Sequence, residues 1–146
     1  MQDANSFGQA HSDGSAPLGI ILIVDDDQTS ATALDLACAG IPGTDVRTAF
    51  SALEAVRILQ DRDAPVRAVV TDIRMPILDG FQLIEFIRAH SRHAATPIIV
   101  VTADTDPETP GRISRLGGNA CFSKPFSPGA VRRTVERLLH ANRTSD

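Results

Sequence analysis

The sequence predicts an α/β fold in which a five-stranded, doubly wound parallel sheet carries helices on both faces. Three observations support this class. Five short apolar runs are each followed by a segment with helical spacing of apolar residues, the connections are short, and turn residues separate the units. Alternation of strands and helices builds a parallel sheet, because each helix returns the chain to the same edge. The sequence shows no repeat and no second domain.

The composition is that of one soluble globular domain. The 146 residues include 42% hydrophobic residues and carry a formal net charge of −4. We expect no nucleic-acid partner, which would need a basic stripe, and no membrane association, since no apolar run could span a bilayer. The start of the chain lacks the basic and apolar parts of a signal peptide, so a cytoplasmic location is expected. Cys38 and Cys121 form no Cys-x-x-Cys pair and are expected to stay reduced, with Cys38 in the core.

The first strand–helix unit follows a polar segment. Residues 1–19 are rich in Ser, Gly, Asp, Asn and Gln and are predicted to be a flexible tail. Residues 20–24 are a continuous apolar run, typical of a strand covered on both faces. A helix is expected over residues 29–39, because Gly40 and Pro42 end it.

The second unit has a strand at residues 45–50 and a helix that begins after Ser51. Glu54 follows three positions later, as in a capping box. The expected apolar face of this helix comprises Leu53, Val56 and Leu59, with Ala52 and Ala55 beside them. In the third unit a strand over residues 66–71 ends at Asp72, and a helix over 81–90 follows a loop.

The fourth unit has a strand at residues 98–101 and a helix over 106–116. Pro110 falls inside that helix, so we expect it to be short, kinked or loose. In the fifth unit a strand at residues 120–123 precedes a helix that Ser127 caps. The domain is predicted to cover residues 20–141, with a polar tail at 142–146. The histidines show no metal-ligand spacing and are expected at the surface; they are His11, His90, His93 and His140.

Polar side chains follow four of the predicted strands at their carboxyl ends. They are Asp25 and Asp26, Asp72, Thr102, and Lys124. Parallel strands place these ends at one edge of the sheet, so acids, a hydroxyl and an amine should converge there. Clustered carboxylates need a cation, and an all-oxygen site suits Mg2+. The set predicts phosphoryl transfer to Asp72 as nucleophile, with Lys124 and Thr102 contacting the phosphoryl oxygens.

In these motifs the chain resembles the response regulator receiver domains of two-component signalling, of the stand-alone kind found in chemotaxis regulators. The matching motifs are Ile23 to Asp27, Thr71 to Pro76 with Asp79-Gly80, Val101 to Ala103, and Ser123 to Phe126. They cover nearly everything outside the two tails. The resemblance implies a flavodoxin-like sheet with strand order 2-1-3-4-5, and a Lys124–Pro125 peptide that is typically cis.

The resemblance also implies a role for each site residue. Asp72 would be the phosphorylated aspartate, and Thr102 and Lys124 the switch hydroxyl and the lysine. Mg2+ would be held by Asp25, Asp26, Asp72 and the backbone carbonyl of Arg74. Arg74 and Asp104 occupy positions that tune dephosphorylation, and a mutual pair could shield the site. The family often has Tyr or Phe where this chain has Cys121, so the aromatic part of the switch should differ here.

The implied partners are a sensor histidine kinase or a histidine phosphotransfer protein, and a downstream protein target. Phosphorylation would shift the face formed by the fourth helix, fifth strand and fifth helix, in a monomer or a phosphorylation-dependent dimer. No enzymatic activity is expected beyond self-catalysed phosphorylation and slow autodephosphorylation.

Three alternatives stay open. One is an interaction module with a vestigial site. Another is a phosphohydrolase with an aspartyl nucleophile, although Arg74 stands where such enzymes commonly carry a second acid. The third is a flavin-binding protein of the same fold class, whose flavin phosphate the acidic run at residues 25–27 would repel.

Overall fold

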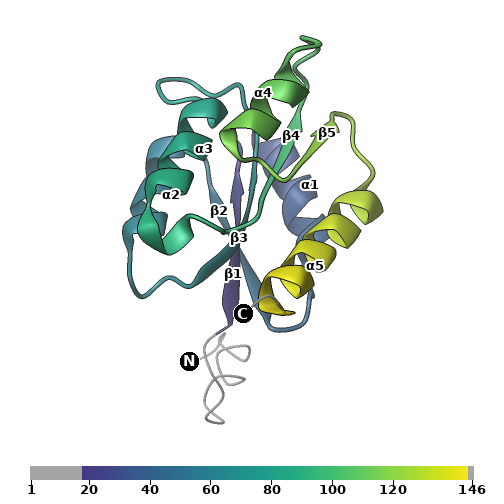
Figure 1. Ribbon diagram of the computed structural model, residues 1–146. Helices are drawn as coiled ribbons and strands as arrows, with labels where there is room; N and C mark the ends of the chain where they lie inside the picture. Colours follow the sequence, from purple (N-terminus) through teal and green to yellow (C-terminus); the bar gives the residue numbers. More distant parts are fainter. Residues whose placement is uncertain (1–17, 145–146) are drawn as a thin grey trace.

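Five parallel strands form a central sheet with helices packed on both faces, as the computed structural model of residues 18–144 shows (Figure 1). The strands are β1 (Gly19–Val24), β2 (Thr44–Ala49), β3 (Val66–Thr71), β4 (Ile98–Thr102) and β5 (Ala120–Ser123). The α-helices are α1 (Gln28–Cys38), α2 (Ala52–Gln60), α3 (Gly80–Ala89), α4 (Thr109–Leu116) and α5 (Pro128–Thr144). The predicted tail over residues 1–19 lies outside the described residues, except for Leu18 and Gly19.

The strand order β2-β1-β3-β4-β5 confirms the predicted topology. In the register of the sheet, Val24 of β1 pairs with Thr71 of β3. The residues that follow these two strands therefore start side by side. Thr102 of β4 pairs with Ser123 of β5, which brings the ends of those strands together in the same way.

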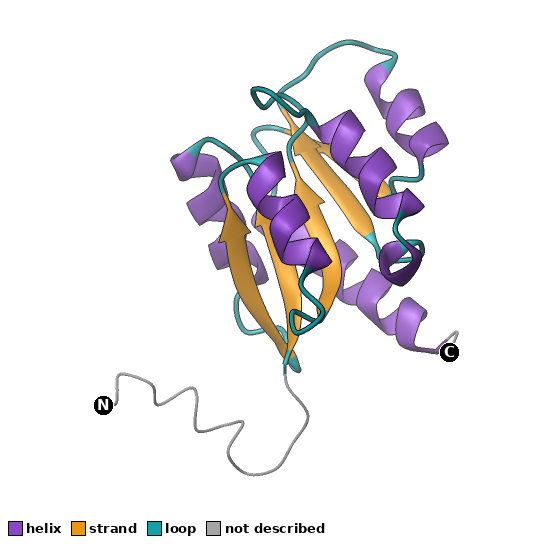
Figure 2. Ribbon diagram, turned by 90° about the vertical axis from the view of Figure 1, so that its left-hand side faces the viewer, coloured by secondary structure: helices purple, strands orange, loops and turns teal. Residues whose placement is uncertain are grey.

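Each face of the sheet has its own apolar core. Side chains of β1 alternate between them: Leu22 and Val24 pack with α2, α3 and α4, whereas Ile21 and Ile23 pack with α1 and α5. Figure 2 shows helices in front of the sheet and behind it. Burial on both faces explains why the strands read as continuous apolar runs. Cys38 lies in the core against α5, as predicted.

The first three helices are capped by their own N-cap side chains. Asp27 accepts a hydrogen bond from the backbone N of Ser30 at 3.0 Å and begins α1. Ser51 accepts from the backbone N of Glu54 at 3.0 Å, as predicted for α2. Asp79 and Gln82 form a complete capping box at the start of α3. These caps satisfy backbone N–H groups that a helix start leaves without partners.

Two helices differ from the prediction. Leu53 is 45% exposed, because α2 turns its small alanines and Leu59 toward the sheet instead. Helix α4 begins only at Thr109, which places Pro110 in its first turn, where the missing N–H is not needed. The helix is short, which is one of the three expected outcomes, although it begins three residues later than predicted.

The final helix is longer than predicted. Helix α5 runs to Thr144, so it includes the first three residues of the polar tail expected over 142–146. No Gly or Pro stands there to end it, since the residues from Asn142 onward are all compatible with a helix. Strand β1 likewise begins one residue before the predicted boundary, at Gly19. Within residues 18–144, no helix has both the length and the apolar character needed to cross a membrane.

The amino-terminal ends of β4 and β5 are held by Arg88, at the end of α3. Its guanidinium donates hydrogen bonds to the Oδ1 of Asn119 and to backbone carbonyls, which belong to His93, Ala94, Thr96 and Gly117. Burial lowers the pKa of Arg88. This one side chain thus ties α3 to the segments that lead into β4 and β5.

The prediction that all histidines lie at the surface is wrong for His93. Its side chain is only 3% exposed, with Nε2 3.0 Å from the carbonyl oxygen of Leu59 and Nδ1 3.2 Å from the hydroxyl of Thr96. A carbonyl can only accept, so Nε2 carries the hydrogen and Nδ1 accepts from Thr96. Both ring nitrogens are satisfied inside the protein, which the sequence spacing of the histidines does not reveal. His11 lies outside the described residues.

Candidate functional site

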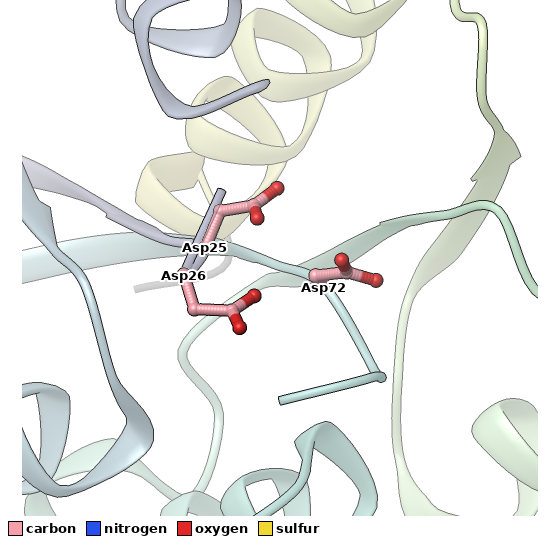
Figure 3. Close-up of side chains that lie close together, drawn as sticks. All are labelled: Asp25, Asp26 and Asp72. Carbon is pink, nitrogen blue, oxygen red and sulfur yellow. The ribbon is translucent and has the colours of Figure 1, made fainter. Parts of the chain in front are cut away.

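Three carboxylates meet at the carboxyl edge of the sheet. Asp25 and Asp26 follow β1, and Asp72 follows the neighbouring β3 (Figure 3). Oxygen atoms of the three lie within 4.8 Å of one another. Asp25 and Asp72 are buried, with exposed fractions of 0% and 7%, while Asp26 is exposed. The predicted convergence of acids at this edge is therefore present.

Lys124 brings a positive charge to two of these acids. Its Nζ lies 2.9 Å from Oδ2 of Asp25 and 3.1 Å from Oδ2 of Asp72. Lys124 follows β5, and its backbone N donates to the carbonyl of Thr102, while the peptide to Pro125 is cis. It is also the one lysine in the whole sequence, in which every other basic residue is arginine or histidine. A compact ammonium can contact two carboxylates at once, whereas a planar guanidinium favours bidentate pairing with one.

The electrostatics of this cluster are balanced between burial and pairing. Burial raises the pKa of Asp25, while the hydrogen bond from Lys124 acts in the opposite direction. Burial would lower the pKa of Lys124, but its hydrogen bonds and charge interactions with Asp25 and Asp72 outweigh it, and the net pKa is raised. Lys124 is thus cationic at neutral pH, and a positive charge nearby stabilises the ionised form of Asp25.

The backbone behind Asp72 is packed closely. Oδ1 of Asp72 accepts from the backbone N of Ile73 at 2.6 Å, and the backbone N of Gly80 donates to the carbonyl of Ile73. A Cβ atom at Gly80 would come 2.3 Å from the backbone oxygen of Asp72. Gly80 was expected only as a loop breaker. Its second role is to let the start of α3 lie directly behind the acid, a contact that only the folded chain reveals.

Thr102 lies at the same edge, although its hydroxyl is turned toward its own loop. The side chain is buried, at 2% exposure, and its Oγ1 accepts from the backbone N of Asp104 at 3.2 Å. Among the residues that the structure describes, no hydrogen bond joins Thr102 to Asp72. The structure thus places Thr102 beside the cluster, but not in contact with its acids.

The expected Arg74–Asp104 pair is present. Nη2 of Arg74 lies 2.7 Å from Oδ2 of Asp104, with side-chain exposures of 65% and 7%. Asp104 also accepts from the backbone N of Asp106 and from the hydroxyl of Thr109, each at 3.0 Å. The Asp106 N–H is the main cause that lowers the pKa of Asp104, with Thr109 and Arg74 adding to it. Sequence reasoning missed Thr109, whose only signal was its place just before a proline.

A cavity of about 350 Å³ lies between Lys124, Thr102 and Cys121, under the β4–α4 loop. Cys121 is exposed on β5, and partial desolvation together with the charge of Asp104 raises the pKa of its thiol. Phe122 points to the opposite face and packs with the α1–α5 core, as predicted. The position where the family often has an aromatic ring therefore borders open space in this chain.

The donor set fits Mg2+. Asp25, Asp26 and Asp72 offer carboxylate oxygens, which are the ligands this hard cation prefers, and the backbone of Arg74 follows in the adjacent loop. With Lys124 counted, the three carboxylates leave a formal charge of −2, which a divalent cation would balance. Because Asp25 is buried, neutralising its charge is more stabilising than it would be at an exposed site.

Comparison with known proteins identifies several relatives. The family model described as the response regulator receiver domain matches residues 21–136. The transcriptional regulatory protein GltR of Pseudomonas aeruginosa is 33% identical over 119 residues, which are 82% of this chain but only 48% of that protein. The chemotaxis protein CheY1 of Helicobacter pylori is 29% identical over 122 residues, 84% of this chain and 98% of that protein.

A solved structure of a response regulator receiver protein from Pseudomonas putida has the same fold. It has a TM-score of 0.74 and 34% identity, and the alignment covers 84% of this chain and 99% of that chain. The chain therefore spans about half of GltR, but nearly all of CheY1 and of the P. putida protein.

Proposed function

The chain belongs to the response regulator receiver domains, and we propose that Asp72 is its phosphoacceptor. Receiver domains are regulatory modules rather than enzymes, so the product of this reaction is a changed state of the protein. The observation that carries the proposal is the placement of Lys124. Its ammonium lies 3.1 Å from Asp72, inside a cluster that holds two further carboxylates.

In the proposed reaction a carboxylate oxygen of Asp72 attacks the phosphorus atom of a phosphohistidine. A P–O bond forms, the P–N bond breaks, and the imidazole leaves with the electron pair of that bond. Oδ2 of Asp72 faces Lys124, while Oδ1 accepts from Ile73. Lys124 stabilises the negative charge of the phosphoryl oxygens, which is where such transfers need it. Once the hydroxyl of Thr102 moves away from the backbone N of Asp104, it can donate to one of those phosphoryl oxygens.

Mg2+ is part of the proposal. Asp25, Asp26, Asp72 and the backbone carbonyl of Arg74 would hold the ion, which would neutralise charge on the acids and on the incoming phosphoryl group. Without it, the phosphoryl group would enter a cluster whose formal charge is already negative. Asp26 is the best placed to bind from solution, because it is the exposed member of the three.

The proposed partners follow from the same chemistry. A sensor histidine kinase or a histidine phosphotransfer protein would supply the phosphoryl group, in the cytoplasm. A protein target would read the changed surface of α4, β5 and α5, with the domain acting as a monomer or as a phosphorylation-dependent dimer. GltR is a longer protein, so its transcriptional role is not transferred to this chain.

The test is direct labelling. The protein is incubated with phosphoramidate and Mg2+, and the adduct is located by mass spectrometry of peptides. We expect one acid-stable, base-labile phosphoryl group on Asp72, absent from Asp72→Asn and present in the control Asp35→Asn, whose residue is exposed on α1. Equal labelling of Asp72→Asn would refute the assignment. An unlabelled parent protein would indicate a vestigial site, and repeated turnover of a phosphate ester would indicate a hydrolase.

A further inference from the structure

Hydrogen bonds join the buried hydroxyl of Thr102 to the first residue of α4. The backbone N of Asp104 donates to Oγ1 of Thr102 at 3.2 Å, and Oδ2 of Asp104 accepts from the hydroxyl of Thr109 at 3.0 Å. Both threonines are nearly inaccessible, at 2% and 4% exposure. One residue, Asp104, therefore connects the end of β4 with the start of α4.

The start of helix α4 depends on contacts from outside the helix more than the starts of α1, α2 and α3 do. Helices α1, α2 and α3 are each capped by the side chain of their own N-cap residue. The N-cap residue of α4 is Glu108, and it makes no side-chain cap hydrogen bond. Pro110 and Gly111 follow in the first turn, where Gly adds backbone freedom. The start of α4 is thus held by the loop before it: Asp106 accepts from the backbone N of Glu108 at 3.0 Å, and Asp104 accepts from the hydroxyl of Thr109.

We propose that Asp104 is a positioning residue that couples Thr102 to the first turn of α4. The proposal rests on the phosphorylation of Asp72 put forward above. Because the hydroxyl of Thr102 does not contact Asp72 in the described chain, it must move to reach a phosphoryl group there. That movement breaks or displaces the bond from the amide of Asp104, and the carboxylate of the same residue then shifts against Thr109. The first turn of α4 loosens, without any aromatic side chain taking part.

The Arg74–Asp104 ion pair shares an oxygen atom with this connection. Nη2 of Arg74 and the hydroxyl of Thr109 both contact Oδ2 of Asp104, at 2.7 Å and 3.0 Å. Arg74 is mostly exposed, and exposed ion pairs are weak and screened by salt. Because Arg74 would also contribute its backbone carbonyl to the proposed Mg2+ site, the control for the experiment is Asp35→Asn, at an exposed residue of α1.

The experiment measures amide hydrogen exchange in the first turns of α4, with and without beryllofluoride and Mg2+ as a phosphoryl mimic. In the parent protein and in the control Asp35→Asn, we expect the mimic to speed exchange of these amides by about tenfold. In Thr109→Val, which removes the hydroxyl but keeps the shape, exchange should be fast already and change less than about twofold. Thr109→Ser should restore the parental response, which a merely structural role of the side-chain volume would not do.

Other outcomes would overturn the coupling. A full parental response in Thr109→Val, or in Thr109→Ala should the valine variant not fold, would show that the hydroxyl transmits nothing. Equal loss of the response in Asp35→Asn would show that it does not depend on the Thr109 hydroxyl in particular. Bound beryllofluoride is followed in parallel by its 19F resonance. If that resonance is absent from the parent protein, the proposed phosphoacceptor fails, and the coupling fails with it; if it is present without a change in α4, only the coupling fails.

Discussion

Two cationic side chains, Lys124 and Arg88, hold loops together at opposite ends of the same sheet. Lys124 contacts two carboxylates at the carboxyl ends of β1 and β3. Arg88 contacts backbone carbonyls and one amide oxygen at the amino ends of β4 and β5, and within residues 18–144 it pairs with no carboxylate. The pKa of Lys124 is raised by its acidic partners, whereas burial lowers the pKa of Arg88.

The difference shows which cation is available for chemistry. The partners of Lys124 are carboxylates, for which a metal ion can compete, and a phosphoryl group can compete with them for Lys124, so its contacts can be exchanged. The partners of Arg88 are uncharged backbone carbonyls and the amide oxygen of Asn119, which also accepts from the backbone N of Ile98 at 2.8 Å. Arg88 is therefore expected to contribute stability, and Lys124 reactivity.

The largest expected effect is on stability, at Arg88. Arg88→Met removes six hydrogen bonds from partly buried oxygen atoms and should lower the free energy of unfolding by about 3 kcal/mol. Phosphoramidate labelling per folded molecule should not change. The matched control is Arg112→Met, which removes a cation stacked 3.7 Å from the Phe81 ring and should cost less than about 1 kcal/mol. Urea unfolding measures both, and similar losses for the two variants would contradict the role of Arg88.

At the carboxyl end of the sheet, Lys124→Met should reduce phosphorylation strongly and stability only slightly. We expect the rate of phosphorylation to fall by about 100-fold, because the charge that stabilises the transferring group is gone. The loss of stability, measured with Mg2+ present, should be smaller than for Arg88→Met, since the ion takes over neutralisation of the acids. Lys124→Arg keeps the charge but not the compact shape, and should recover only part of the rate. A labelling rate close to that of the parent protein in Lys124→Met would remove the functional contrast.

Mg2+ should stabilise the Lys124 end alone. At tenfold above its dissociation constant, the ion should add about 1.4 kcal/mol to the free energy of unfolding. Asp26→Asn should lose this gain while the stability without Mg2+ changes by less than about 0.5 kcal/mol, because Asp26 is exposed. The control Asp35→Asn should keep the full gain. Calorimetry with and without chelator measures the difference, and retention of the gain by Asp26→Asn would exclude it as a ligand.

The smallest effect concerns pH at the Arg88 end. Burial lowers the pKa of His93 from its ordinary value of 6.5, although its bond to the Leu59 carbonyl partly opposes this. Below pH 6.5 the unfolded chain therefore binds a proton more readily than the folded one. Stability should fall as the pH drops from 6.5 toward the folded pKa.

Urea unfolding across this pH range tests the assignment to His93. His93→Gln should flatten the slope, and His140→Gln, which alters an exposed side chain on α5, should not. An unchanged slope in His93→Gln would assign the pH dependence to another group.

The sequence predicts the Lys124 end better than the Arg88 end, for a physical reason. Asp25 and Asp72 stand directly after buried strands and Lys124 directly after the half-buried β5, and parallel topology brings such positions together. Their convergence follows from strand order alone. Arg88 and His93 find hydrogen-bond partners in turns, and the periodicity of apolar residues does not predict the geometry of turns. The same limit hid the contact between Asp104 and Thr109.

Helix faces and ends were predictable only in part. The cap of α2 at Ser51 follows from local chemistry, and so does the termination of α1 near Gly40. The exposure of Leu53 depends on how α2 is rotated against the sheet. The small alanines of α2 permit this rotation, but their presence in the sequence does not predict it. Gly80 likewise looked like a loop residue, because a missing side chain shows its importance only when the neighbouring backbone is in place.

The single lysine has a practical consequence. An amine-acylating reagent can modify only two kinds of amine in this chain, the terminal α-amino group and the ε-amine of Lys124. The second is held between Asp25 and Asp72 and is mostly buried. Its rate of acylation thus reports the occupancy of the site directly, without a fluorophore in a sequence that contains neither Trp nor Tyr.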